Sequence, residues 1–203
     1  MSSLARREHW NRRYAAGDRI PSASSASPFL VGEVADLPPG RALDMACGTG
    51  RNAVWLAERG WRVTAVDFSD VAVEMARALA ASRGVDVEWL CADVVTWTPP
   101  LRAFDLVCAL YLQLPADERR MALAHAANAV RPGGTLLVVG HDLLNLTEGW
   151  AGPKQPEVLF TPDDVVAEIG GLLVLKAQRV TRAVDEGGVM HEAIDALVRA
   201  RRP

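Results

Sequence analysis

Three aspartates and one glycine-rich turn are the residues whose types and spacing best suit ligand chemistry. Asp44 lies in an apolar run that ends at Gly48-Thr49-Gly50, and Asp67 and Asp93 follow two later apolar runs. Glycines let a backbone approach a ligand closely, and carboxylates accept hydrogen bonds from hydroxyl and amino groups. Asp67 is therefore suited to a ribose diol and Asp93 to an adenine amino group.

Each of these features also has a structural interpretation. The glycine turn fits a tight strand-to-helix connection, and with Ala53 it satisfies the dinucleotide pattern G-x-G-x-x-A. An aspartate after a strand also caps turns and helices. The shared position of all three aspartates, at the ends of successive apolar runs, favours a common ligand.

Two further residues are candidates for chemistry on a second reactant. His141 directly follows the apolar run 135–140 and is the best candidate for a general base, while Tyr111 follows 104–110 and is placed to position an acceptor. The alternatives are a histidine that hydrogen-bonds to backbone and a tyrosine that packs in the core.

Alternating strands and helices must position these residues. The expected strands are 41–47, 61–66, 85–91, 104–110 and 135–140, and the expected helices between them are 51–59, 71–82 and 117–130. Strands that are apolar on both faces and alternate with helices predict an α/β fold with a doubly wound, Rossmann-like, mostly parallel sheet of seven strands. A helix at 161–169 and a hairpin of 172–184 with 189–198 should add an antiparallel C-terminal strand at the end of the sheet.

Composition narrows the class of protein. The 203 residues are 50% apolar and 23% charged, with a net charge of −3 and a pI near 5.8, which fits one globular domain and argues against a dedicated nucleic-acid binder. Cys47, Cys91 and Cys108 have neither zinc-site nor disulfide spacing. Without an apolar run long enough to span a bilayer, we expect a cytoplasmic protein with no metal and no membrane partner.

The motifs together resemble class I S-adenosylmethionine-dependent methyltransferases. The matching segments, in family order, are Leu43-Asp44-Met45-Ala46-Cys47-Gly48-Thr49-Gly50, Val66-Asp67-Phe68-Ser69, Cys91-Ala92-Asp93-Val94, Phe104-Asp105-Leu106-Val107 and Arg131-Pro132-Gly133-Gly134-Thr135-Leu136. The resemblance implies S-adenosylmethionine as cofactor, with Asp44 at the methionine amino end, Asp67 on the ribose and Asp93 on the adenine. The cofactor-binding residues expected from it are Trp10, Tyr14, Asp44, Ala46, Cys47, Gly48, Thr49, Gly50, Asn52, Asp67, Phe68, Ser69, Ala92, Asp93, Val94 and Leu110.

Two segments narrow the resemblance. His9-Trp10-Asn11-Arg12-Arg13-Tyr14 and Gly50-Arg51-Asn52-Ala53-Val54-Trp55-Leu56-Ala57 are similar to small bacterial methyltransferases of the tellurite-resistance and thiopurine types. In those relatives an N-terminal tryptophan and tyrosine close over the cofactor, which implies this role for Trp10 and Tyr14. The alternative is simple packing of an N-terminal helix on the sheet.

These expectations define one domain and one reaction. Residues 1–40 should form an N-terminal cap, 41–141 the cofactor-binding core, 142–160 a lid loop with Trp150, and 161–203 the C-terminal helix and hairpin. The expected reaction is in-line methyl transfer to a small-molecule thiol, chalcogen oxyanion or hydroxyl, by a monomer or homodimer. An NAD(P)-binding oxidoreductase and a non-catalytic cofactor-binding protein that acts through partners are the alternatives.

Overall fold

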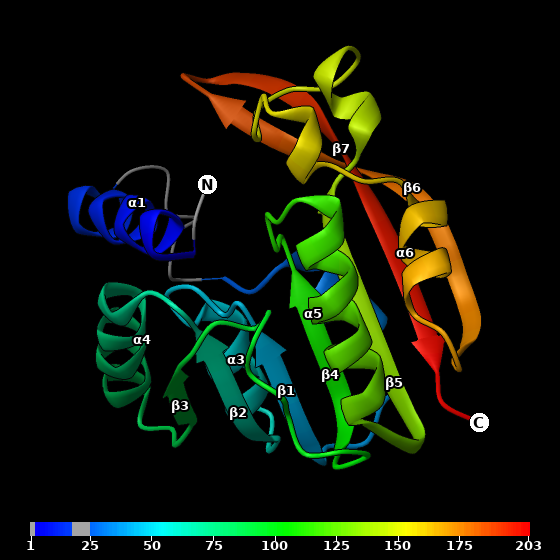
Figure 1. Ribbon diagram of the computed structural model, residues 1–203. Helices are drawn as coiled ribbons and strands as arrows, with labels where there is room; N and C mark the ends of the chain where they lie inside the picture. Colours follow the sequence, from blue (N-terminus) through cyan, green and yellow to red (C-terminus); the bar gives the residue numbers. More distant parts are fainter. Residues whose placement is uncertain (1–2, 18–24) are drawn as a thin grey trace.

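Seven strands form a single mixed sheet in the computed structural model, which describes residues 3–17 and 25–203 (Figure 1). The strands are β1 (Arg41–Met45), β2 (Arg62–Asp67), β3 (Glu88–Cys91), β4 (Phe104–Leu110), β5 (Val130–His141), β6 (Leu173–Glu186) and β7 (Val189–Arg201). Their order is β3-β2-β1-β4-β5-β7-β6, and β7 is antiparallel to both neighbours while the pairs among β1–β5 are parallel. This confirms the predicted fold class.

Helices cover both faces of the sheet. They are α1 (Ser3–Ala16), α2 (Pro28–Glu33), α3 (Arg51–Ala57), α4 (Asp70–Arg83), α5 (Ala116–Ala129) and α6 (Pro162–Glu168), with the short 3-10 turns η1 (Leu143–Leu146) and η2 (Pro156–Val158). On one face α5 and α6 bury Leu123 and Val165, and on the other α2, α3 and α4 bury Leu30, Leu56 and Ala76. The core therefore lies in two layers, one on each side of strands that are themselves buried.

Local signals in the sequence set the helix boundaries. The Ser69 hydroxyl accepts a hydrogen bond from the backbone N–H of Ala72 and caps α4. Thr161 and Asp164 form a reciprocal capping box at the start of α6, where Pro162 occupies the first turn. Both helices therefore begin at residue types that favour the N-cap position.

Two strands start three or more residues away from their predicted first residue. β3 starts at Glu88 rather than at residue 85, because the backbone N–H of Val85 donates to Ala80 and completes the end of α4. β5 starts at Val130 rather than at residue 135, and Pro-Gly-Gly at 132–134 lies inside it as an irregular extension, with a register shift against β4. A side chain at Gly134 would come within 2.9 Å of the Phe104 carbonyl oxygen, so this close strand contact needs a glycine.

The hairpin of β6 and β7 reaches beyond the carboxyl end of β5. β7 pairs with β5 only from residue 195 onward, whereas 189–194 pair with β6 alone. The reversed strand β7 therefore lies one position inside the sheet, and β6, not β7, is the edge strand. The projecting part of the hairpin stands next to η1 and η2 at the top of Figure 1.

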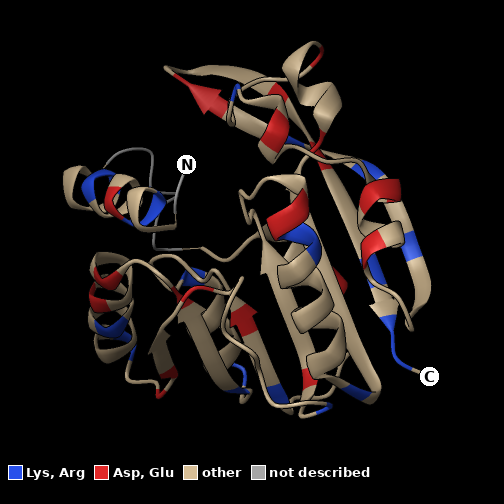
Figure 2. Cartoon of the chain, in the orientation of Figure 1, with Lys and Arg blue, Asp and Glu red and all other residues tan. Residues whose placement is uncertain are grey.

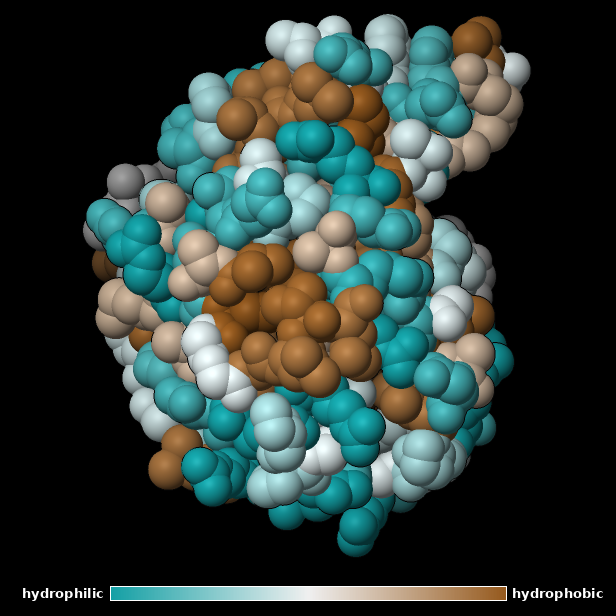
Figure 3. All heavy atoms as spheres, turned by 90° about the vertical axis from the view of Figure 1, so that its right-hand side faces the viewer, coloured by the Kyte–Doolittle hydropathy of each residue, from teal (hydrophilic) through white to brown (hydrophobic). Residues whose placement is uncertain are grey.

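The surface on the β6 side carries exposed apolar side chains. They include Val166 of α6 and Leu173 and Leu175 of β6, and Figure 3 shows apolar residues gathered on this face. Lys and Arg are interspersed with Asp and Glu over the elements in Figure 2. In the described part of the chain, no helix has the length and hydropathy to cross a membrane.

Candidate cofactor and acceptor site

The three aspartates singled out by the sequence meet at one edge of the sheet. Asp44 lies near the carboxyl end of β1, Asp67 ends β2 and Asp93 follows β3, and these strands are neighbours. Doubly wound sheets bind ligands at this edge, because the loops there splay apart. The structure therefore brings together the residues on which the cofactor prediction depends.

Asp67 is held between the glycine turn and the start of α4. One carboxylate oxygen accepts from the backbone N–H of Gly48 at 2.8 Å, and the other accepts from that of Ser69 at 2.9 Å. Burial raises the pKa of Asp67 to about 6, although these backbone hydrogen bonds lower it. Each oxygen keeps a further lone pair, so the carboxylate is positioned and still able to accept from two hydroxyl groups.

Asp44 is a buried carboxylate that lacks a close hydrogen-bond donor among the residues that the structure describes. It is 1% exposed, and neither oxygen has a partner within normal hydrogen-bond geometry, although the backbone N–H of Ala53 is near enough to lower its pKa. Burial and the nearby charge of Asp67 raise its pKa to about 7, and Arg51 opposes this rise. A buried acceptor without a partner is costly, and a bound ammonium group would supply the missing donors.

The glycine turn has two distinct constraints. Gly50 has a φ of 81°, and a side chain there would come within 2.7 Å of Ala76 and 2.6 Å of Trp89, so this glycine permits close packing of α4 and β3. A side chain at Gly48 would come within 3.0 Å of the Tyr14 hydroxyl oxygen. Gly48 therefore faces Tyr14 of α1, whereas Gly50 faces Ala76 of α4 and Trp89 of β3.

Helix α1 lies across this edge of the sheet. The Arg6 guanidinium forms an ion pair with Glu118 of α5 at 2.5 Å, and Arg7 pairs with Asp70 of α4 at 3.1 Å. The Trp10 and Tyr14 rings lie 5.6 Å apart, on the same helix. Burial raises the pKa of Tyr14, so its hydroxyl remains a hydrogen-bond donor above the glycine turn.

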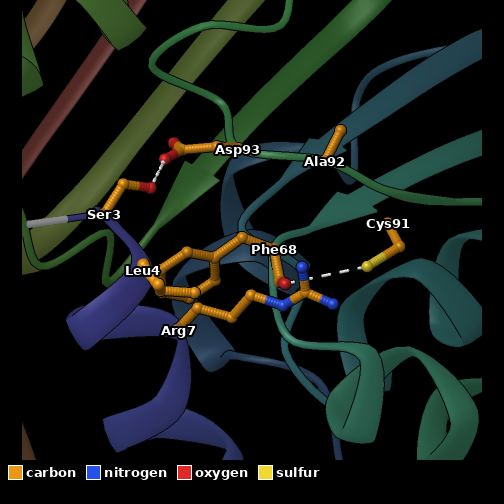
Figure 4. A pocket seen from close by; sticks show the side chains of 7 residues that line it. All are labelled: Ser3, Leu4, Arg7, Phe68, Cys91, Ala92 and Asp93. Carbon is orange, nitrogen blue, oxygen red and sulfur yellow. Dashed lines mark hydrogen bonds between the residues drawn. The ribbon is translucent and has the colours of Figure 1, made fainter.

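A cavity of about 330 Å³ lies between α1 and the ends of β2 and β3 (Figure 4). It is lined by Ser3, Leu4, Arg7, Phe68, Cys91, Ala92 and Asp93. Asp93 accepts from the Ser3 hydroxyl and, as in a capped turn, from the backbone N–H of Val95 at 3.0 Å. Asp93, predicted to bind the adenine, therefore shares one cavity with two other predicted cofactor-binding residues, Phe68 and Ala92. Asp93 also accepts a backbone hydrogen bond within its own turn, which was the alternative interpretation of this residue.

Other residues of the predicted cofactor set have structural partners. The Asn52 amide oxygen accepts from the backbone N–H of Ser27 at 2.9 Å and ties the segment before α2 to α3. The Ser69 hydroxyl caps α4, and Val94 packs in the core. Burial raises the pKa of Cys47, which therefore stays a thiol beside the turn. Ala46, Thr49 and Leu110 lie at the same edge, in the turn after β1 and at the end of β4.

A second polar cluster lies at the carboxyl ends of β4 and β5. His141 Nδ1 lies 3.1 Å from one oxygen of Asp195, and the other oxygen accepts from the Tyr111 hydroxyl at 2.9 Å and from Arg182 Nε at 2.7 Å. His141 thus bonds to a carboxylate and not to backbone. Tyr111 has a φ of 59°, a strained conformation for a tyrosine that is typical of functional positions.

The sequence prediction missed Asp195 and Arg182. Asp195 is a single charged residue inside the apolar run of β7. Ala193 before it is fully buried, and Leu197 after it is almost fully buried. A buried strand rarely contains an unpaired carboxylate. That isolated charge was the signal that could have found it, whereas the partner Arg182 is set only by the register of the hairpin.

The loop after β5 packs against the second cluster and the hairpin. The Trp150 ring stacks on His191 at 4.0 Å, and its Nε1–H donates to Glu186 at 2.6 Å. Trp150 therefore lies on the hairpin rather than over the cofactor edge. Gly152 comes close to His141, because a side chain there would lie 3.0 Å from Nδ1.

The chain is similar in sequence to known methyltransferases. Residues 42–134 match the model of the methyltransferase domain family. Glycine N-methyltransferase of Rattus norvegicus is 34% identical over 143 residues, which cover 62% of this chain and 48% of that protein. Demethylmenaquinone methyltransferase of Thermus thermophilus is 36% identical over 103 residues, covering 50% of this chain and 47% of that protein. The chain spans about half the length of the curated relatives it matches.

Solved structures share the whole fold. A protein from a study of the conversion of a disulfide bond into a thioacetal group in echinomycin biosynthesis has a TM-score of 0.77 at 24% identity, over 96% of this chain and 91% of that one. TehB from Haemophilus influenzae has a TM-score of 0.74 at 16% identity, over 95% of this chain and 67% of that one. At these identities the likeness concerns the fold.

Proposed function

We propose that this protein transfers a methyl group from S-adenosylmethionine to a small-molecule acceptor, because residues 42–134 match the methyltransferase domain family and the sequence motifs resemble class I S-adenosylmethionine-dependent methyltransferases. The acceptor class we propose is a thiol, a chalcogen oxyanion or a hydroxyl compound. The observation that carries the proposal is the orphaned carboxylate of Asp44 beside the turn that Asp67 anchors.

The described residues fit the cofactor. The Asp44 carboxylate lacks a close hydrogen-bond donor, and the ammonium group of the methionine part would supply one. The Asp67 carboxylate has free lone pairs that can accept from the ribose hydroxyls. The cavity lined by Phe68 and Asp93 has an apolar wall and a carboxylate for an adenine. Trp10 and Tyr14 are proposed to cover the methionine end from α1.

For methyl transfer, the main task of the protein is to align the acceptor with the methyl group. When bound, the cofactor supplies an activated methyl group on a good leaving group. The protein must hold the acceptor in line with that methyl group and exclude water. We propose Tyr111 as a residue that positions the acceptor and His141 as the general base for acceptors that carry a proton.

We expect Asp67→Ala to weaken binding of S-adenosylhomocysteine by about 10-fold to 100-fold, because hydrogen bonds to a charged group contribute about 1.5–3 kcal/mol. The measurement is calorimetric titration of the purified chain. Asp86→Ala is the matched control, since Asp86 is an exposed aspartate that precedes the amino end of β3 and so lies at the opposite edge of the sheet. Unchanged affinity in Asp67→Ala, or binding of NADH in place of S-adenosylhomocysteine, would contradict the proposal and favour a dinucleotide enzyme.

The affinity for S-adenosylhomocysteine should also depend on pH. The pKa of Asp44 is raised to about 7 and that of Asp67 to about 6, so both carboxyls take up protons as the pH falls through this range. The ligand's ammonium needs the ionised form of Asp44. We therefore expect the affinity to fall by up to about 10-fold per pH unit below 7 for that one group.

Proton release provides the direct check on this assignment. Titration slightly below neutral pH, in buffers with different ionisation enthalpies, should show that binding releases protons. Asp44→Asn should remove the part of this release that comes from Asp44, and Asp86→Asn, at the opposite edge of the sheet, should leave it unchanged. Equal proton release by wild type and Asp44→Asn would exclude Asp44 as the residue that meets the ammonium group.

A further inference from the structure

The Asp195 carboxylate joins three elements beside the expected acceptor position. On β7 it pairs in register with His141 of β5 and with Val180 of β6. It is 0% exposed, and it accepts from the His141 ring, the Tyr111 hydroxyl and Arg182 Nε. Three donors on a fully buried carboxylate fix its orientation.

These contacts determine which nitrogen of His141 carries the proton. Arg182 can only donate, so Asp195 is the acceptor of the cluster, and its ionised form accepts from Nδ1–H of His141. No described residue bonds to Nε2. Nε2 is also not fully buried, so solvent or a ligand can reach it. A neutral imidazole held in this way presents a lone pair at Nε2.

We propose that Asp195 is a positioning residue that fixes His141 in the Nδ1–H form, so that Nε2 can take the proton of a neutral, protic methyl acceptor. The inference rests on the proposed methyltransferase function. It removes the chalcogen oxyanion from the proposed acceptors and adds the neutral amine, so that the acceptor is a hydroxyl, amine or un-ionised thiol that must lose a proton. It also gives a role to Asp195 and Arg182, which were not singled out from the sequence.

The step balances in protons and electrons. The acceptor's lone pair forms the bond to the methyl carbon, the carbon–sulfur bond breaks, and its electron pair stays on sulfur. The acceptor's proton passes to Nε2 of His141, and the imidazolium is stabilised by Asp195. Release of that proton to solvent restores the neutral ring.

The other charged groups around the ring support this assignment. Burial and Asp195 raise the pKa of Tyr111, so the phenol stays protonated and acts as a donor rather than a base. Arg182 and the partly buried Arg51 lie on the Tyr111 side. Asp142, next in the chain after His141, is committed to Arg179 at 2.9 Å. Asp195 is therefore the carboxylate that contacts the ring.

Asp195→Asn gives a direct spectroscopic test. The amide oxygen must face Arg182, which only donates, so the amide NH₂ turns toward His141 and donates to Nδ1. We expect the ring to switch to the Nε2–H form, which has no lone pair at Nε2. Long-range ¹H–¹⁵N spectra of the ligand-free protein report the tautomer, and His141→Gln assigns its signals among the four histidines.

Asp142→Asn is the matched control. Asp142 is also a fully buried aspartate paired with an arginine, but it does not contact His141. We expect its substitution to leave the Nδ1–H form of His141 unchanged. An Nε2–H or doubly protonated His141 in the wild type near neutral pH, or no change in Asp195→Asn, overturns the proposal. Titration with S-adenosylhomocysteine shows that the variants are folded and separately tests the proposed function.

Turnover of two related acceptors tests the acceptor class. Phenol keeps its proton near neutral pH, whereas benzenethiol is largely ionised and needs no base. We expect Asp195→Asn to slow methylation of phenol at least about 10-fold more than that of benzenethiol. An equal loss for both, or wild-type turnover of benzenethiol alone among phenol, a primary amine and benzenethiol, overturns the protic-acceptor assignment.

Discussion

Glu168→Ala should lower the free energy of unfolding by about 3–5 kcal/mol, because it leaves the charge of Arg119 buried without a partner. The Arg119 guanidinium donates two parallel hydrogen bonds to Glu168, at 2.8 and 3.0 Å, and both side chains are at most 6% exposed. This pair joins α5 to α6, and Arg119 also lies over the Phe160 ring at 5.0 Å. Urea unfolding followed by circular dichroism measures the change.

The exposed pair on the same helix is the control. Arg120 and Asp117 lie 3.3 Å apart with side chains 63% and 95% exposed, so Asp117→Ala should change the unfolding free energy by less than about 0.5 kcal/mol. The double variant Arg119→Met with Glu168→Leu should recover most of the loss, since no unpaired charge remains. A loss below about 1 kcal/mol in Glu168→Ala would mean that water or another group replaces the partner.

The sequence predicted the architecture well because its signals are local. A short apolar run such as 104–110 indicates a buried strand. Capping residues such as Ser69 and Thr161 form hydrogen bonds with the first turn of the helix that follows them. The errors fall where long-range contacts decide. Residues 132–134 continue β5 where it lies close beside β4, with a shift in the register. The inner position of β7 follows from its antiparallel pairing with β5, a strand far from it in the sequence.

In the candidate site, too, residues marked by local sequence signals could be predicted, whereas those that depend on long-range contacts could not. Asp44 and Asp67 could be found from strand ends, since every parallel strand delivers its carboxyl end to one edge. Asp195, the partner of His141, could not be found in this way. It lies more than fifty residues later in the sequence, and only the antiparallel pairing of β5 with β7 brings it to His141. The structural role of Gly50 was equally hidden, since it depends on how closely α4 and β3 approach the turn.

His141→Ala should lower the turnover of a protic acceptor about 100-fold or more, because general-base catalysis contributes about 10²–10⁴-fold. The affinity for S-adenosylhomocysteine should change little, since His141 lies at the end of β5 and the two carboxylates proposed to bind the cofactor lie on β1 and β2. The measurement is the rate of S-adenosylhomocysteine formation, with phenol as the first acceptor.

Three comparisons separate a base from a packing residue. His191→Ala removes a histidine that stacks on Trp150, outside the cluster, and should leave the rate unchanged. Added imidazole should restore part of the lost rate in His141→Ala, because it supplies the missing base in the vacated space. Benzenethiolate needs no base and should react at nearly the wild-type rate. A variant that is equally slow with both acceptors would show that His141 shapes the acceptor site rather than taking the proton.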